Sequence, residues 1–318
     1  MLALPRRGFQ RSVNQHNIEL AVCCDWLEAT ALFTDEGSVT GAEVVDVLRE
    51  NEIYATQEFA WELVNGAFAN IQERRRLLGA GYPLHLANRT RLERSQGWER
   101  YPGYTFCLTL SLAYAYPEWA RAFGPDFTVQ GELFERFTAE SVQASFAGWS
   151  VRATGWTRTN TRGLRAIVDE VATLLGEATG DLLRWTKRSA KEAGLDLLCF
   201  RAFPDGRVGV PVFLVQCASG LDWKAKLRTP DLRIWTKIIT FASNPKKAFA
   251  TPFALQDSDF IQSCNVVNGL LLYRFRLLAP GRALHDWLSE DLTSRLTEWV
   301  RPRILSLPVS ERAAEQLA

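Results

Sequence analysis

The chain has 318 residues, 47% of them apolar and 23% charged, and a formal net charge of +1. This composition is typical of a folded globular protein, and the length suffices for one large domain or two of ordinary size. The near-zero net charge argues against a protein that coats nucleic acid. No apolar run reaches the ~18 residues of a membrane-spanning helix, so we expect no membrane partner.

Signature motifs of several enzyme classes are missing from the sequence. Neither GxxxxGK(S/T) nor GxGxxG occurs, which disfavours an ATPase or a dinucleotide enzyme, and GxSxG is missing as well. The six cysteines form no CxxC pair, so a zinc ribbon or disulfide framework is not indicated, and the reduced cytoplasm is the expected compartment. The basic start, Met1 to Arg11, lacks the apolar segment of a signal peptide. His16, His85 and His285 lie far apart, so any chemistry is expected to use carboxylates and lysines.

The first part of the chain is expected to be mostly helical, beginning with residues 17–78. Ser38 can cap a helix whose apolar positions follow at helical spacing. A longer helical pattern runs from Thr56 to Leu78 and ends at the following glycine. Residues 81–103 are rich in glycine, proline, asparagine and charge, and we expect a loop there.

The stretch Tyr104 to Phe123 is apolar and aromatic, and its larger side chains alternate. This alternation favours a strand, whereas the alanines between the larger residues also suit a buried helix. The segment Gly124 to Asp126 then breaks the pattern. The sequence therefore predicts two domains, a mostly helical region over residues 1–125 and an α/β domain over residues 126–318.

The second domain opens with an amphipathic helical pattern and then alternates between strand and helix patterns. Two apolar strands, Leu195 to Phe203 and Val210 to Cys217, are joined by a turn at Pro204 to Arg207. The other expected elements are a helix at 130–146, a strand at 149–156, a helix at 163–177, a helix capped by Asp222, strands at 247–255 and 269–278, and a helix at 284–300.

Two polar residues mark the outer ends of these apolar strands. Asp196 stands at the opening of the first strand and Gln216 near the close of the second, so a hairpin brings them together. Hydrolysis of a phosphodiester needs a cation that polarises the phosphoryl group and activates a water. Magnesium takes oxygen ligands, usually one or two carboxylates plus waters, and a nearby lysine can stabilise the developing charge. An Asp and an oxygen acceptor at the ends of adjacent strands are one compact way to supply such a site for Mg²⁺ or Mn²⁺.

This arrangement resembles the PD-(D/E)xK, or restriction-endonuclease-like, nuclease superfamily. That family carries a strand Asp, then an acidic residue, one spacer and a lysine at the end of the next strand, often with a Glu on the preceding helix. Asp196 matches the first element, and Glu135 on the expected 130–146 helix matches the helix element. Gln216 stands in place of the second acid and Ala218 in place of the lysine. The resemblance implies Asp196, Glu135 and Gln216 as metal ligands.

The string QCASGLDWKAK, from Gln216 to Lys226, resembles a variant subgroup found among bacterial restriction- and defence-related proteins. In that subgroup the lysine has moved to the following helix, which implies Lys226 as the catalytic lysine and Lys224 as the alternative. The resemblance covers about Phe127 to Leu278 and implies a mixed central sheet flanked by helices. It implies a nuclease for which DNA is favoured, in a restriction or anti-phage system with partner proteins, and a homodimer, since two strands need two cuts.

Other interpretations of the same residues remain open. Asp196 can cap a turn, Gln216 can be an ordinary buried amide, and Glu135 and the lysines can face solvent. Glu132 and Glu140 on the same helix compete with Glu135 for the metal role. The replacements at Gln216 and Ala218 also fit a degenerate nuclease fold that binds nucleic acid or a protein without cutting. A third alternative is an interaction protein whose N-terminal region makes the contacts. The stretch 184–247, with 13 Lys/Arg against five Asp/Glu, suits either a phosphate-binding surface or a solvated face.

Overall fold

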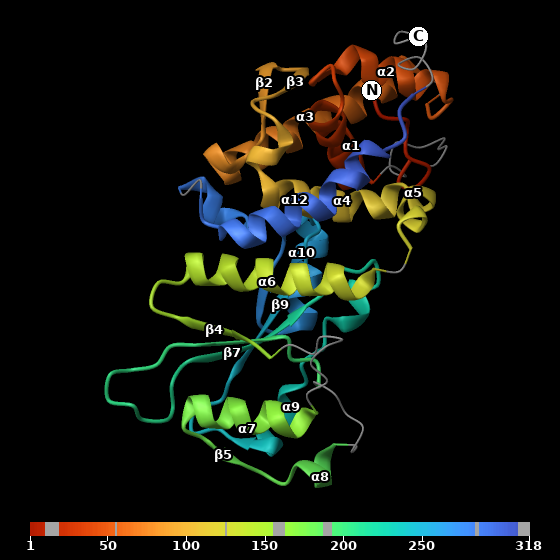
Figure 1. Cartoon of the computed structure of the whole chain (residues 1–318). Coiled ribbons are helices and arrows are strands. Elements are labelled where there is room, and N and C mark those ends of the chain that lie inside the picture. Colours follow the sequence, from red (N-terminus) through yellow and green to blue (C-terminus); the bar gives the residue numbers. More distant parts are fainter. Residues whose placement is uncertain are drawn as a thin grey trace. The chain divides into compact units, whose positions relative to one another are not determined.

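The computed structural model describes residues 1–9, 19–54, 56–124, 126–154, 163–186, 193–283 and 286–310. The chain forms two compact units (Figure 1): one comprises Met1–Pro125 and Leu278–Ala318, and the other comprises Asp126–Leu277. Some of our predictions fall on residues outside these ranges. They concern His16, residues 155–156, the basic residues between 187 and 192, and residues 284–285.

The division differs from the expected one at its C-terminal end. The second unit begins at Asp126, where the expected domain begins, but it ends at Leu277 rather than at residue 318. The tail carries α12 (Glu290–Leu305), the helix expected at 284–300, which packs against α4 (Pro102–Ala115) of the first unit. Burial of an apolar stripe of α12 therefore joins the tail to the first unit.

The first unit is mainly helical and contains one small antiparallel sheet with the strand order β1–β3–β2. Its helices are α1 (Leu20–Phe33), α2 (Gly41–Glu50), α3 (Gln57–Leu78), α4, α5 (Pro117–Ala122) and α12, with the 3-10 turns η2 (Gly79–Gly81), η3 (Trp98–Arg100) and η5 (Ala279–Arg282). Its strands are β1 (Ser38–Thr40), β2 (Leu84–Asn88) and β3 (Arg91–Arg94).

Two predictions in this unit are corrected. Ser38 lies in β1, and the residue that caps α2 is Thr40. The Thr40 Oγ1 accepts from the Glu43 backbone N–H at 3.3 Å, and the Glu43 carboxylate accepts from the Thr40 backbone N–H at 2.7 Å. This reciprocal pair satisfies donors that the helix start leaves open. The loop expected at 81–103 contains β2 and β3, because Leu84 and Leu92 are buried and hold the hairpin against α1.

The segment expected as a strand from Tyr104 onwards is instead the helix α4, followed by α5. Ten of the 14 residues of α4 are buried, so the helix is covered on all sides. A helix that is apolar all round belongs in a core, and there the alternation of large side chains does not distinguish a helix from a strand. The strand prediction is therefore wrong, and the buried-helix alternative is correct.

A buried ionic group connects α1 and α3. The guanidinium of Arg74, which is 2% exposed, pairs with Asp25 at 2.6 Å and with Glu28 at 2.8 Å. The Tyr82 hydroxyl donates to Glu28 at 2.6 Å. Burial raises the pKa of Tyr82, and the Glu28 carboxylate adds to the rise, so the hydroxyl keeps its proton. Since buried charges are stable only when paired, this group ties three segments of the first unit together.

The second unit is a mixed α/β domain around a five-stranded sheet of order β10–β9–β7–β6–β4. The strands β4, β6 and β7 pair antiparallel, whereas β7, β9 and β10 pair parallel. The strands are β4 (Ser150–Ala153), β6 (Leu197–Phe200), β7 (Val212–Cys217), β9 (Lys246–Ala250) and β10 (Leu270–Leu272), with β5 (Ala178–Thr179) paired to β8 (Ile239–Thr240) separately. The helices are α6 (Phe127–Ser145), α7 (Leu164–Leu175), α8 (Leu182–Trp185), α9 (Leu232–Ile238), α10 (Asp257–Val267) and α11 (Arg274–Leu277), with the 3-10 turn η4 (Trp223–Lys226).

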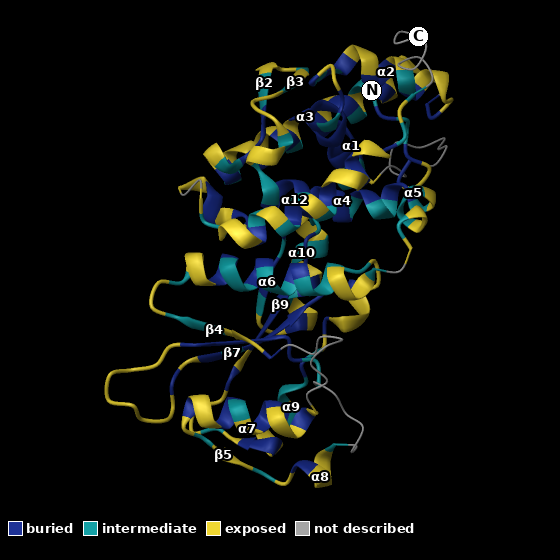
Figure 2. Ribbon diagram, viewed as in Figure 1, coloured by how far each residue is buried: buried dark blue, intermediate teal, exposed yellow. Residues whose placement is uncertain are grey.

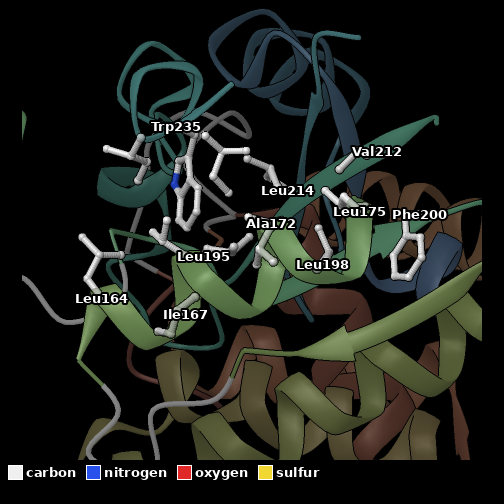
Figure 3. Packing of buried hydrophobic residues seen from close by; sticks show 14 of the residues in the cluster. Leu164, Ile167, Ala172, Leu175, Leu195, Leu198, Phe200, Val212, Leu214 and Trp235 are labelled. Carbon is white, nitrogen blue, oxygen red and sulfur yellow. The ribbon is translucent and has the colours of Figure 1, made fainter. Parts of the chain in front are cut away.

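Helices cover this sheet on both sides, as the mixed α/β expectation requires. The helix α6 contacts β4 and β7, and α7 lies on the opposite side of the sheet (Figure 1). A core cluster on the α7 side includes Leu198 of β6, Leu214 of β7 and Trp235 of α9 (Figure 3). Figure 2 shows the central strands β7 and β9 as mostly buried, and for β7 this agrees with its nearly continuous apolar sequence.

Two elements of this unit differ from their predictions. The helix expected after Asp222 is the short 3-10 turn η4, and the Asp222 side chain makes no capping hydrogen bond. The strand expected at 269–278 ends at Leu272; Arg274 then turns inward, where its Nε donates to the carbonyl of Pro252 at 2.8 Å, and α11 begins. Among the described residues, no helix combines the length and apolarity needed to cross a membrane.

Candidate functional site

The structure brings Asp196 and Gln216 together, as the predicted hairpin requires. Leu197 of β6 pairs with Val215 of β7, so Asp196 and Gln216 are the next residues outward on the two strands. The Gln216 Nε2 donates to Asp196 Oδ2 and also, at 3.1 Å, to the carbonyl oxygen of Cys217. The Cys217 backbone N–H donates to the same Asp196 oxygen at 2.6 Å. Both side chains are nearly buried, with 8% of Asp196 and 7% of Gln216 exposed.

The other end of the Gln216 amide faces Thr229, a residue that no sequence motif marks. The Thr229 Oγ1 lies 3.0 Å from Gln216 Oε1 and 2.6 Å from the carbonyl oxygen of Lys226. Gly194 makes room for this contact: a Cβ at that position would lie 2.8 Å from the Thr229 Cβ and 3.2 Å from Gln216 Oε1. With a φ of +71°, Gly194 also has a backbone conformation that other residues rarely adopt.

An open cleft of about 690 Å³ lies over these residues within the second unit. It is formed by the first turns of α6, the ends of β6 and β7, and the loop that leads into η4. Four described carboxylates and one described lysine line it: Glu132, Glu135, Asp196, Asp222 and Lys226. The cleft is therefore acidic, and it contains four of the five residues that the sequence selected.

Glu135 reaches the cleft from α6 and is half-buried. Burial raises the pKa of Cys217 most, and the carboxylates of Asp196 and Glu135 raise it further. Asp196 and Glu135 both line the cleft at the end of β7.

The two candidate lysines have different surroundings. Lys226 lines the cleft, with its side chain exposed. Lys224 instead pairs with Asp259 of α10 at 3.2 Å, on a surface where the two side chains are 59% and 47% exposed. Of the two candidate lysines, Lys226 lines the cleft and Lys224 is paired on the surface.

Two further polar residues support the walls of the site. Gln130 of α6 donates to both the carbonyl and the hydroxyl oxygen of Ser219 at 3.1 Å, which holds the loop after β7. Lys247 of β9 is 7% exposed, and its Nζ donates to the carbonyl of Leu227 at 3.1 Å, next to η4. Burial lowers the pKa of Lys247. A lysine inside an apolar strand is the sequence signal that marks Lys247, whereas Gln130 has no such signal.

The chemistry of the donor set fits a hard divalent cation. Among the described residues, no group of three or more His, Cys, Asp or Glu side chains is placed to hold a metal ion. Magnesium does not need one, because it is usually held by one or two carboxylates and keeps several waters. Asp196 and Glu135, which both line the cleft, are the carboxylates that would hold such a cation.

Comparisons of the chain with known protein families, with curated proteins and with solved structures found no match. The function is therefore inferred from the residues of the cleft.

Proposed function

We propose that the second unit is a restriction-endonuclease-like nuclease that hydrolyses nucleic acid, with DNA as the favoured substrate and Mg²⁺ or Mn²⁺ as cofactor. The observation that carries the proposal is the convergence of Asp196, Gln216, Glu135 and Lys226 on one cleft. The motif resemblance selected these residues from separate parts of the sequence. They lie on α6, at the start of β6, on β7 and in the turn η4.

The charge of the cleft supports a cation-dependent reaction on an anionic substrate. Four described carboxylates and one lysine line the cleft, so an approaching phosphodiester meets net repulsion. A divalent cation held by Asp196 and Glu135 would remove this repulsion. When bound, such a cation polarises the phosphoryl group and lowers the pKa of a water.

The protein residues have separable roles in this proposal. Asp196 and Glu135 hold the cation, and Gln216 adds a neutral oxygen to its shell. The exposed ammonium of Lys226 reaches into the cleft and stabilises negative charge that develops on the phosphate. The walls formed by α6 and the loop after β7 fix the scissile group near these residues.

The biological setting is proposed from the resemblance of the string between Gln216 and Lys226. It points to a bacterial restriction or anti-phage system, in which the chain acts with partner proteins. A homodimer is proposed on the same basis, because cleavage of both strands of a duplex needs two sites.

A second candidate function is supported by the hydrogen bonds of Gln216. Its Nε2 donates to the Asp196 carboxylate and to the Cys217 carbonyl, so both acceptors are satisfied by the protein itself. With Ala218 at the usual lysine position, this suits a degenerate nuclease fold that binds nucleic acid or a protein without cutting. In that case the cleft has no use for a cation.

The deciding experiment is a cleavage assay with the full chain. Plasmid DNA and linear single- and double-stranded DNA are incubated with Mg²⁺, Mn²⁺ or EDTA, beside Asp196→Ala and Asp205→Ala. Asp205 lies in the exposed turn between β6 and β7, and its substitution is the matched control. Metal-dependent cleavage that disappears in Asp196→Ala and persists in Asp205→Ala supports the nuclease. Cleavage that survives Asp196→Ala refutes the site, and binding without cleavage favours the degenerate fold.

A further inference from the structure

The Gln216 amide can satisfy its surroundings in two ways. In the structure, Nε2 donates to Asp196 Oδ2 and to the Cys217 carbonyl, while Oε1 faces the Thr229 hydroxyl at 3.0 Å. The same hydroxyl lies closer, at 2.6 Å, to the carbonyl oxygen of Lys226. A threonine hydroxyl has one hydrogen and two lone pairs, so it donates to only one of these two oxygens at a time.

The second arrangement follows from a half-turn of the amide, which exchanges Oε1 and Nε2. Nε2 then donates to the Thr229 oxygen, and the Thr229 hydrogen goes to the Lys226 carbonyl, its nearer acceptor. Oε1 comes to lie beside Asp196 Oδ2 and the Cys217 carbonyl oxygen. Three converging oxygens repel one another when nothing lies between them, and together they suit a hard divalent cation.

We propose that Thr229 is a positioning residue that lets Gln216 change between these two arrangements. Without a cation, the amide nitrogen of Gln216 points toward Asp196. With a bound divalent cation, Oε1 of Gln216 points toward the cation. This inference rests on the proposed function, from which it takes the cation. Gln216 is a ligand only in the second arrangement. There Thr229 supplies the acceptor that the buried amide N–H group needs.

Thr229 also connects the amide to the turn that carries the candidate lysine. Its backbone N–H donates to the Lys226 carbonyl at 2.9 Å, and in the second arrangement its hydroxyl donates fully to the same oxygen. Cation binding would thereby strengthen the hold on the end of η4. The close approach of Gly194 keeps Thr229 in the position where both arrangements are available.

The test compares Mn²⁺ binding to the full chain for the wild type, Thr229→Val and Thr229→Ser, by calorimetry and by the electron paramagnetic resonance of free Mn²⁺. Valine has the shape of threonine without the hydroxyl. We expect Thr229→Val to bind Mn²⁺ about tenfold more weakly, the effect of one buried hydrogen-bond partner. Thr229→Ser keeps the hydroxyl and should bind within about twofold of the wild type. A purely structural role lowers the thermal midpoint in EDTA and leaves the Mn²⁺ affinity unchanged.

A second readout follows Gln216 itself. The side-chain amide signal of Gln216 in a nitrogen-15 NMR spectrum is the one that is lost in Gln216→Glu. Addition of Mg²⁺ should shift this signal in the wild type. At the same Mg²⁺ concentration, the shift should be smaller in Thr229→Val. If Asp196→Ala abolishes Mn²⁺ binding while Thr229→Val binds as the wild type does, the inference is overturned and the proposed function stands. If the wild type binds no Mn²⁺ at millimolar concentration, both are overturned.

Discussion

Gln216 donates a hydrogen bond from its amide nitrogen to Asp196 Oδ2, across the outer ends of β6 and β7. The same oxygen accepts the Cys217 backbone N–H at 2.6 Å, and both side chains are more than nine-tenths buried. A neutral donor therefore lies where the family pattern places a carboxylate and its cation. If the cleft binds a divalent cation, as proposed, the residue at position 216 should control its affinity.

Replacing Gln216 with glutamate is expected to raise the affinity for Mn²⁺ about tenfold, because a charged ligand oxygen faces Asp196 without any rotation. In EDTA the variant should be less stable than the wild type, since a third carboxylate joins Asp196 and Glu135. Titration calorimetry and thermal unfolding with and without Mn²⁺ measure both effects.

The matched control for this change is Gln130→Glu, which adds the same charge to the same cleft at a residue that contacts Ser219. If Gln130→Glu raises the affinity as much as Gln216→Glu, general charge and not ligation explains the effect. A wild type without activity and an active Gln216→Glu variant would identify the chain as a degenerate nuclease.

The two candidate lysines are expected to differ in kinetics. Lys226→Ala should reduce the cleavage rate by about 10²–10³-fold, the usual effect of removing one group that stabilises developing charge. Lys224→Ala should cleave at nearly the wild-type rate, because Lys224 pairs with Asp259 on the surface. Single-turnover rates on linear DNA at saturating Mg²⁺ make the comparison, and the opposite order of effects would move the catalytic role to Lys224.

The pairing of Asp196 with Gln216 could be predicted because it depends on short-range features. Two apolar strands with one turn between them form a hairpin, and its outer ends then meet whatever the rest of the fold does. Lys226 was selected only by the resemblance, which placed it on a helix, whereas the structure has the 3-10 turn η4 there. Thr229 could not be predicted, since its contact depends on the shape of the turn after η4 and on the missing side chain of Gly194.

Long-range packing explains the predictions that were wrong. The helix α4 is covered on all sides, so its sequence lacks the polar stripe that distinguishes a helix from a strand. The tail after Leu277 joins the first unit through the contact between α12 and α4. A prediction that follows chain order assigns such a tail to the preceding domain. The correct unit depends on which helix the apolar stripe of α12 packs against, and that helix is α4.

Glu135 is expected to act as a ligand, whereas its neighbour Glu132 is not. Both line the cleft from α6, but Glu135 is the carboxylate that acts together with Asp196 on Cys217. Glu135→Gln should weaken Mn²⁺ binding and slow cleavage, each by about 10–100-fold. Glu132→Gln is the matched control and should change both by less than about threefold. Equal losses in the two variants would show that the cleft needs negative charge rather than a particular ligand.

The first unit should depend strongly on Arg74. Its guanidinium is the cation that Asp25 and Glu28 share, at 2.6 and 2.8 Å, and its side chain is 3% exposed. Arg74→Met keeps the apolar part of the side chain and removes the charge, which leaves two buried carboxylates near each other. Breaking a buried ion pair in this way costs about 3–5 kcal/mol of unfolding free energy. Urea unfolding at pH 7, followed by circular dichroism, measures the loss.

Arg76→Met provides the comparison for Arg74→Met. Arg76 is two residues further along α3 and pairs with Glu73 on the surface, where the side chains are 69% and 49% exposed. Solvent screens such a pair, so the urea midpoint of this variant should stay close to that of the wild type. The triple variant Asp25→Asn, Glu28→Gln, Arg74→Met removes the charges on both sides and should recover part of the stability. Equal midpoints for Arg74→Met and Arg76→Met would contradict a role of the buried ionic group in the stability of the first unit.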